Sequence, residues 1–237
     1  MAVLSAFSDE EIMTYLKQQV PDGTVSDDPE ILRRQSFSTE TVLRDSDLAR
    51  AFVSAKSVAD IQGVLKTARR FHIPVVPQTA FTNTVISADG ITGAIILSLL
   101  QMDKILEIDS DDLLAVVQPG VINNDLDQAA RKQGLFYAPD PGSKPISSIG
   151  GNAATNADGM STVRFGATKD NILGLKVILA DGRIVKLGGT ISGEHAVGML
   201  KNQWNNVELG ENVDELQHQI KSLLDPMGIL NPKRKID

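Results

Sequence analysis

A strand, helix, strand order over residues 51–78 constrains the fold more than any other stretch of this sequence. The short apolar run 51–55 precedes Ser57, a residue typical of a helix N-cap, and apolar residues then recur on one helical face up to Phe71. The β-branched run "IPVVPQ" follows at once and indicates a buried strand. Two strands joined by a helix predict a parallel pair with a right-handed crossover.

The flanking segments predict an α+β protein. Ser8 and Glu11 form a capping-box pattern for a short helix that ends before Pro21, and we expect this helix to lie as a satellite beside the main core. Further strands are expected over 94–97, 104–108 and 113–117, a helix over 121–133, a hairpin over 173–187 and an amphipathic helix over 208–224. This order predicts a βαβ lobe followed by a mainly antiparallel lobe.

Residues 138–168 contain no convincing periodic element, yet they are rich in glycine and small polar residues. A connection of that length is uncommon in a compact domain unless it binds something. The backbone of Gly150 and Gly151, with short polar side chains around it, suits a planar, polyanionic ligand. A glycine-rich surface loop fits the same residues equally well, so both interpretations remain open.

Composition narrows the possible functions. The chain has no cysteine, which excludes disulfides, thiolate nucleophiles and iron–sulfur clusters, so any redox chemistry must come from a bound cofactor. A net charge of −7 argues against non-specific binding to nucleic acid. No apolar run approaches the roughly 20 residues that span a bilayer, and the first residues lack the pattern of a secretion signal, so we expect a cytoplasmic protein.

Several motifs together resemble one flavoprotein family. "PDP" at 139–141, "SIGGN" at 148–152, "TNA" at 155–157 and Gly159 are similar to the flavin-binding domain of the D-lactate, glycolate and D-2-hydroxyglutarate dehydrogenase family. This family belongs to the vanillyl-alcohol-oxidase-like flavoproteins, whose FAD domain is of the PCMH type. The strand–helix–strand stretch, "VVQPGV" and "ADGRIV" follow in the order that this family shows, so the resemblance covers nearly the whole chain.

The resemblance implies a two-lobed α+β FAD-binding domain with the flavin between the lobes. It divides the chain into an N-terminal helical segment (1–44), the FAD domain (45–190, lobes about 45–93 and 94–190) and a C-terminal segment of the family's oxidase domain (191–237). It implies FAD as cofactor and a small 2-hydroxy acid as substrate, whose hydride passes to the flavin. The positions that match flavin-contacting residues are Pro77, Gln78, Ala80, Thr82, Asn83, Pro119, Gly120, Asp140, Ser148, Gly150, Gly151, Asn152, Thr155, Asn156, Gly159, Ile178 and Asn231. Asn231, followed by proline, fits a helix-stop signal equally well.

The sequence departs from this family at the loop 77–84, which matches the pyrophosphate-binding loop. Positions that are glycine in the family hold Thr79, Phe81 and Asn83, and Asp158 replaces a further glycine. A bulky side chain is costly where the backbone needs a positive φ, and we expect these changes to weaken FAD binding. Thr190 also runs directly into "ISGEHAVG", where the family would have its substrate-binding cap domain.

The Glu194–His195 pair in that last segment is the candidate catalytic site by resemblance. In metal-using members of the family, Glu194 would match a metal ligand and His195 a catalytic or substrate-contacting residue. The chain has three histidines, and His72 and His218 have the character of ordinary helix residues, so we predict no metal site. A small-residue turn, or packing of His195 beside the flavin edge, are the alternatives.

Two functions therefore remain open from the sequence. One is an FAD-dependent D-2-hydroxyacid dehydrogenase with impaired turnover. The other is a non-catalytic flavin-fold protein that binds FAD weakly or not at all and acts through a partner, or is a truncated remnant. An FAD lobe without its cap would expose an apolar face, which favours a homo-oligomer.

Overall fold

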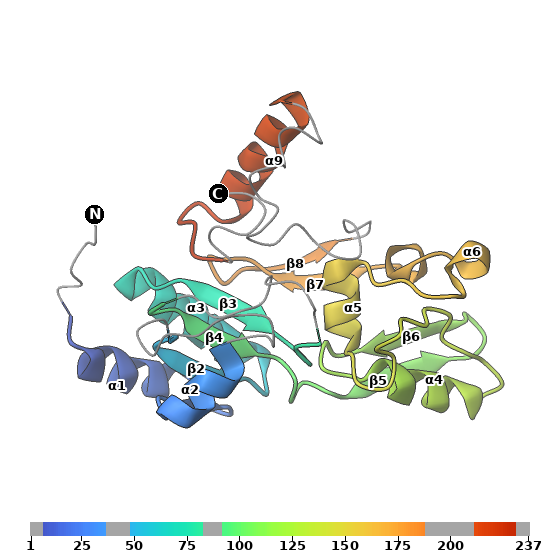
Figure 1. The fold of residues 1–237 in the computed structure, drawn as a ribbon, viewed down its shortest axis with the longest axis horizontal. Helices are drawn as coiled ribbons and strands as arrows, with labels where there is room; N and C mark the ends of the chain where they lie inside the picture. Colours follow the sequence, from blue (N-terminus) through green and yellow to red (C-terminus); the bar gives the residue numbers. More distant parts are fainter. Residues whose placement is uncertain (1–6, 37–47, 83–91, 188–210, 231–237) are drawn as a thin grey trace.

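A four-stranded sheet in the order β1-β2-β4-β3 forms the first part of the structure, a computed structural model that describes residues 7–36, 48–82, 92–187 and 211–230 (Figure 1). Its strands are β1 (Thr24–Ser26), β2 (Ala51–Ser54), β3 (Val75–Gln78) and β4 (Ile95–Ser98). β2 and β3 each pair with β4 in parallel, and β1 pairs with β2 in the antiparallel direction. The predicted strand–helix–strand unit is confirmed, with α3 (Val58–Phe71) as its helix, but β4 separates its two strands. The strand expected over 94–97 is this β4, so the first sheet continues past residue 93.

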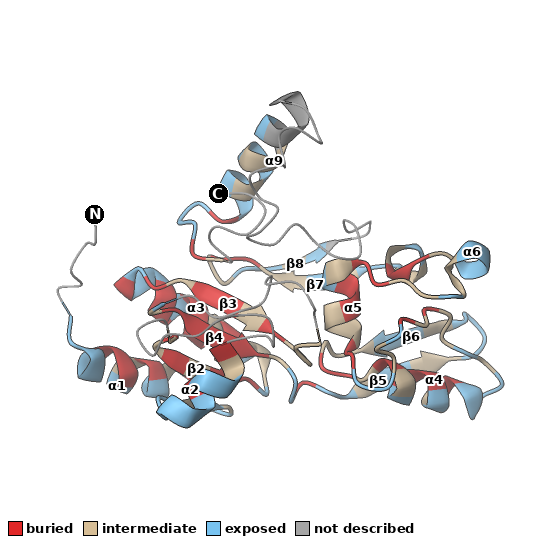
Figure 2. Ribbon diagram, viewed as in Figure 1, coloured by how far each residue is buried: buried red, intermediate tan, exposed pale blue. Residues whose placement is uncertain are grey.

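The main hydrophobic core lies between this sheet and two helices, α1 (Asp9–Gln19) and α3, and Figure 2 shows buried residues concentrated there. Ser8 and Glu11 cap α1 as the sequence predicted. The expectation that this helix is a satellite was wrong, because Ile12 and Leu16 are only 1% and 0% exposed within the core. A β-carbon on Gly63 of α3 would lie 1.9 Å from the Gln19 carbonyl oxygen, so glycine permits the close approach of the two helices.

A buried carboxylate fixes the segment that leads into β1. Asp60 of α3 is 0% exposed and accepts hydrogen bonds from the backbone amides of Asp22 (3.0 Å), Lys56 (2.9 Å) and Ser57 (3.0 Å). Burial by itself raises the pKa of Asp60, but these hydrogen bonds outweigh burial and hold the pKa below its usual value. The N-terminal segment is therefore tied to α3, although neither β1 nor α2 (Pro29–Ser36) was predicted.

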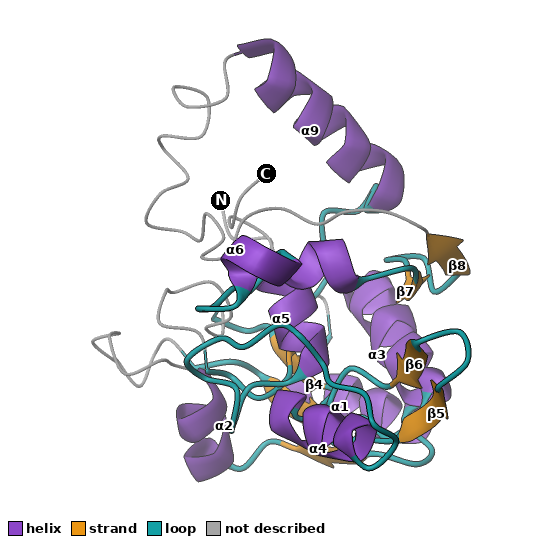
Figure 3. Ribbon diagram, turned by 90° about the vertical axis from the view of Figure 1, so that its right-hand side faces the viewer, coloured by secondary structure: helices purple, strands orange, loops and turns teal. Residues whose placement is uncertain are grey.

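The second part is built from two antiparallel strand pairs and short helices. Its strands are β5 (Ile105–Asp109), β6 (Leu114–Val117), β7 (Leu175–Ile178) and β8 (Ile184–Leu187). Its helices are α4 (Asn123–Arg131), α5 (Ile149–Thr155), α6 (Thr162–Phe165) and the 3-10 turn Thr168–Asn171. α5 and α6 correct the expectation that 138–168 holds no regular element, since seven and four residues are too short to show helical periodicity (Figure 3). With the first sheet, this confirms the predicted α+β class.

The β7–β8 hairpin rests on α3 of the first part. Gln62 Nε2 donates to the Gly182 carbonyl at 2.7 Å, and Arg69 Nη1 donates to the Asp181 carbonyl at 3.1 Å. Both donors come from α3, and both acceptors lie in the hairpin turn. These contacts attach the β7–β8 hairpin of the second part to α3 of the first part.

The C-terminal segment returns to the free edge of β3. The predicted amphipathic helix is present as α9 (Glu211–Leu224) and extends away from the sheets in Figure 1. The buried Asp225 carboxylate accepts the backbone amides of Ile229 and Leu230, both at 3.0 Å, and Val75 donates its amide to the Ile229 carbonyl at 2.7 Å. Across the described ranges, no helix is both long and apolar enough to cross a membrane.

Candidate functional site

The loop that follows β3 begins at a firmly held residue. Gln78 is 4% exposed, accepts the Leu99 amide on its carbonyl at 2.8 Å and donates Nε2 to the Gln35 carbonyl at 2.9 Å. Pro77, Ala80 and Thr82 are partly exposed around it. Phe81 has a φ of 54°, which lies in the left-handed region that residues other than glycine rarely adopt. The resemblance implies glycine at this position, and glycine favours the conformation that Phe81 adopts here.

The N-terminal end of α5 brings the glycine pair against two other predicted segments. Ser148 caps the helix by accepting the Gly151 amide on Oγ at 3.2 Å. Gly150 donates its amide to the Pro119 carbonyl at 2.8 Å, and a β-carbon on Gly150 would lie 2.6 Å from the Pro119 Cβ. A β-carbon on Gly151 would lie 2.9 Å from the Thr79 hydroxyl. The loop after β3, the Pro119 turn and α5 therefore converge within direct contact.

Gly120 connects this cluster to the end of β4. Its amide donates to the Met102 carbonyl at 2.7 Å, and a β-carbon on it would lie 2.4 Å and 2.6 Å from the carbonyl oxygens of Leu100 and Leu99. No side chain fits there without moving backbone. The Pro119–Gly120 turn is thus packed between the segment after β4 and α5.

Asp140 lies in the loop before α5 and holds the segment after it. The Ser161 amide and hydroxyl donate to the two Asp140 carboxylate oxygens at 2.9 Å and 2.8 Å. A β-carbon on Gly159 would lie 2.0 Å from the Asp140 carbonyl oxygen. Asp140 and Gly159, predicted separately as flavin contacts, are therefore neighbours.

Three further predicted positions have partners within the fold. Thr155 donates its hydroxyl to the Gly151 carbonyl at 3.0 Å, and Asn156 ends α5 with a φ of 49° and accepts the Lys169 amide on Oδ1 at 2.8 Å. Ile178, the last residue of β7, packs against the core of the first sheet.

Asn152, the residue after Gly151 in α5, carries a buried polar side chain. Asn152 is 3% exposed, and within the described part of the chain its Nδ2 donates no hydrogen bond. A buried donor left unsatisfied costs about 1–3 kcal/mol, so such an atom points to a ligand that accepts a hydrogen bond there.

Comparison with known protein families shows the family to which the chain belongs. The family described as FAD binding domain matches residues 49–188, which is more than half of the chain. The chain belongs to this family of FAD-linked oxidoreductases. A second family, the C-terminal domain of FAD-linked oxidases, matches residues 175–234. The expected family is thereby confirmed.

Proteins similar to this chain include a D-lactate dehydrogenase and a glycolate oxidase subunit. It is 45% identical over 140 residues to D-lactate dehydrogenase from Anaerostipes hadrus, covering 59% of this chain and 29% of the relative. It is 35% identical over 159 residues to glycolate oxidase subunit GlcD from Bacillus subtilis, covering 67% of this chain and 34% of the relative. The chain therefore spans about a third of the length of these relatives.

Solved structures agree on the fold of the FAD domain. 4-Ethylphenol oxidase from Gulosibacter chungangensis matches with a TM-score of 0.68 at 23% identity, over 81% of this chain and 38% of that one. BBE-like 1 from Physcomitrella patens matches with a TM-score of 0.65 at 20% identity, over 77% of this chain and 38% of that one. The predicted two-lobed PCMH-type fold is confirmed.

The residues at the convergence fit FAD in kind. FAD carries phosphate and ring oxygens that accept hydrogen bonds, and the unpartnered Asn152 Nδ2 is a donor. Gly150 packs closely against Pro119 and Gly151 against Thr79, which brings three predicted flavin-contacting segments to one place. Thr79 and Phe81 reduce this fit. The Thr79 hydroxyl packs next to Gly151, and Phe81 is a bulky residue in a left-handed backbone conformation.

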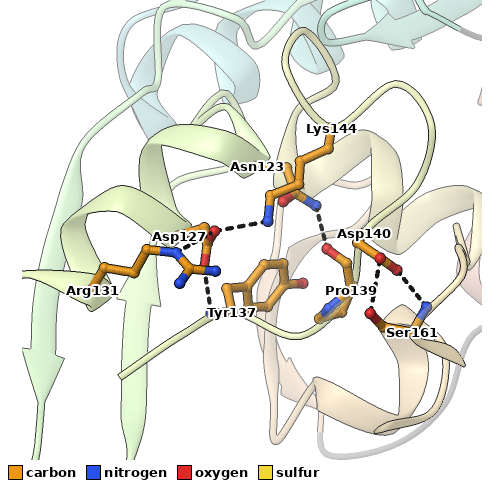
Figure 4. Close-up of polar contacts among 8 residues, drawn as sticks. All are labelled: Asn123, Asp127, Arg131, Tyr137, Pro139, Asp140, Lys144 and Ser161. Carbon is orange, nitrogen blue, oxygen red and sulfur yellow. Dashed lines mark hydrogen bonds and ion pairs between the residues drawn. The ribbon is translucent and has the colours of Figure 1, made fainter. Parts of the chain in front are cut away.

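One polar network near the site was missed from the sequence (Figure 4). Asp127 of α4 accepts the Tyr137 amide at 3.0 Å, Lys144 Nζ at 2.8 Å and Arg131 Nε at 3.0 Å. Burial raises the pKa of Asp127, but the hydrogen bonds from Lys144, Arg131 and Tyr137 outweigh it and hold the pKa below its usual value. Burial raises the pKa of the Tyr137 hydroxyl to about 12. The available signal was the spacing of Asn123, Asp127 and Arg131, four apart on a predicted helix.

Four predicted site residues, Asn83, Glu194, His195 and Asn231, lie outside the described residues. Within the ranges that are described, no group of three or more histidine, aspartate or glutamate side chains is placed to hold a metal ion.

Proposed function

We propose that this chain binds FAD at the convergence of the loop after β3, the Pro119–Gly120 turn and α5. The observation that carries the proposal is the buried, unpartnered Asn152 Nδ2 beside Gly150 and Gly151. The matched FAD binding domain over 49–188 supports the choice of cofactor.

We further propose that the bound flavin serves the oxidation of a small 2-hydroxy acid, such as D-lactate or glycolate. The names of the relatives support this substrate class: D-lactate dehydrogenase, glycolate oxidase subunit and D-2-hydroxyglutarate dehydrogenase. When bound, FAD supplies the acceptor for the substrate hydride. His195 as base and Glu194 as its orienting partner remain predictions of the resemblance.

The described residues would contribute binding and orientation. Asn152 would donate a hydrogen bond to an acceptor of the flavin, and the glycine pair would hold α5 close to the Pro119 turn and the loop after β3. Asp140, through Ser161, would hold the segment around Gly159 against the loop 139–148. The chemistry proposed for these residues is therefore positioning, with no proton transfer assigned to them.

A second candidate is a flavin-fold protein that binds FAD weakly and turns over no substrate. Phe81 at a φ of 54° and the Thr79 hydroxyl against Gly151 favour it, because both sit in the loop that matches the pyrophosphate-binding loop. For both candidates, a cytoplasmic location stays a prediction from the sequence.

Two measurements on the purified protein separate these candidates. A flavin absorbance spectrum after FAD addition and gel filtration tests binding, and reduction of a dye by D-lactate, glycolate or D-2-hydroxyglutarate tests turnover. Retained flavin with dye reduction supports the dehydrogenase, and retained flavin without it supports the second candidate. A preparation that stays colourless with excess FAD contradicts both.

A further inference from the structure

One face of α4 carries three polar side chains, and two of them, Asn123 and Asp127, bind the loop 137–144. Asn123, Asp127 and Arg131 follow one another at intervals of four residues, so they share a helical face. The Asp127 side chain is 6% exposed, which is unusual for a carboxylate and requires several partners.

Asp127 binds two points of the loop that lie on either side of Asp140 (Figure 4). Its Oδ1 accepts the Tyr137 amide at 3.0 Å, and its Oδ2 accepts Lys144 Nζ at 2.8 Å. Between them, Asn123 Nδ2 donates to the Pro139 carbonyl at 3.2 Å. The stretch 137–144 is therefore held to α4 at both ends and near its middle.

This held stretch leads into the candidate FAD site in two directions. Asp140 accepts two hydrogen bonds from Ser161, next to Gly159. Further along, the Asn123 amide donates to the Ser147 carbonyl at 2.9 Å, and Ser148 forms an antiparallel bridge with Ile122 immediately before α5. Movement of this loop would therefore displace the segment around Gly159 and also the start of α5.

We propose that Asp127 is a positioning residue for the FAD site, acting through Lys144 and Tyr137 to hold the loop that carries Asp140 and Ser148. The inference rests on the proposed binding of FAD. The two ion pairs of Asp127 differ in what they hold: Lys144 belongs to the loop, whereas Arg131 belongs to α4 itself. Their exposure differs as well, at 21% for the Lys144 side chain and 62% for that of Arg131. An exposed pair contributes little, so Lys144 carries the tether.

This difference supplies a matched pair of variants. Lys144→Gln and Arg131→Gln each remove one cation from Asp127, but only the first removes a contact between Asp127 and the loop. We expect Lys144→Gln to weaken FAD binding about tenfold in a fluorescence titration, Arg131→Gln to change it less than about twofold, and Lys144→Arg to restore it. Each titration is made at a temperature well below the midpoint of thermal unfolding of that variant, so that the protein is folded.

A second readout needs no flavin. In amide hydrogen exchange of the protein without FAD, Lys144→Gln should speed exchange at Tyr137 and Ser161, and Arg131→Gln should not. If wild type binds FAD and the two glutamine variants do not differ from each other in affinity, the inference is overturned and the proposed function stands. If wild type binds no FAD, the proposed function fails and the inference fails with it, whatever the exchange pattern.

Discussion

Substituting Gly159 by alanine is expected to disrupt the link between Asp140 and the segment after α5. The new β-carbon would lie 2.0 Å from the Asp140 carbonyl oxygen and 2.4 Å from its carbonyl carbon, whereas such contacts are essentially never closer than 3.0 Å. One of the two backbones must therefore move by about 1 Å, at an overpacking cost of about 1–3 kcal/mol. That movement also strains the Ser161 hydrogen bonds to the Asp140 carboxylate, at 2.9 Å and 2.8 Å. We expect Gly159→Ala to lower the free energy of unfolding by about 3 kcal/mol.

The matched control is Gly142→Ala in the same loop. Gly142 is exposed, and a β-carbon on it would meet no atom within 4 Å, so its substitution should change the free energy of unfolding by less than about 0.5 kcal/mol. Urea unfolding followed by far-ultraviolet circular dichroism measures both variants. FAD titration of Gly159→Ala should show weaker binding than that of Gly142→Ala. Equal stabilities of the two variants would refute the close approach of Gly159 and Asp140.

Two further predictions concern the loop after β3 and the buried carboxylate of α3. Phe81→Gly removes a bulky side chain from the loop that matches the pyrophosphate-binding loop, and we expect FAD to bind several-fold more tightly; unchanged binding contradicts the assignment of this loop. Asp60→Asn should lower the free energy of unfolding by about 3 kcal/mol at neutral pH. Because the folded pKa of Asp60 lies below the unfolded value of about 3.9, its contribution is complete above that pH and is lost as pH falls through the folded pKa. The stability of Asp60→Asn in urea should thus fall less steeply with acid than that of wild type, and parallel curves would contradict the role of Asp60.

Local signals in the sequence predicted the first part well, because its elements are long or strongly patterned. α3 has fourteen residues, an N-cap at Ser57 and an apolar face; a short apolar run precedes it and a β-branched run follows it. The position of β4 between β2 and β3 was not predictable, since it depends on contacts between residues far apart in the chain. The burial of α1 depends in the same way on Gly63 of a distant helix.

In the candidate site too, local motifs were predicted and contacts between distant residues were not. Glycines that admit close backbone approach, at 150 and 159, were found by their motif, and the structure supplies their neighbours, Pro119 and Asp140. α5 was missed because "IGGNAAT" lacks any apolar periodicity and its glycines disfavour a helix. The pairing of Asp127 with Lys144 was missed because nothing in the sequence shows that the loop 137–148 folds back on α4.

Titrating FAD into wild type and Asn152→Leu tests the central claim most directly, that buried Asn152 faces the flavin. Leucine has a similar volume and removes a buried donor that lacks a partner, so the unfolding free energy without FAD should stay equal or rise. FAD should bind wild type with one flavin per chain and bind Asn152→Leu about tenfold more weakly. Equal affinity of the two proteins, or no binding to wild type, would contradict the claim.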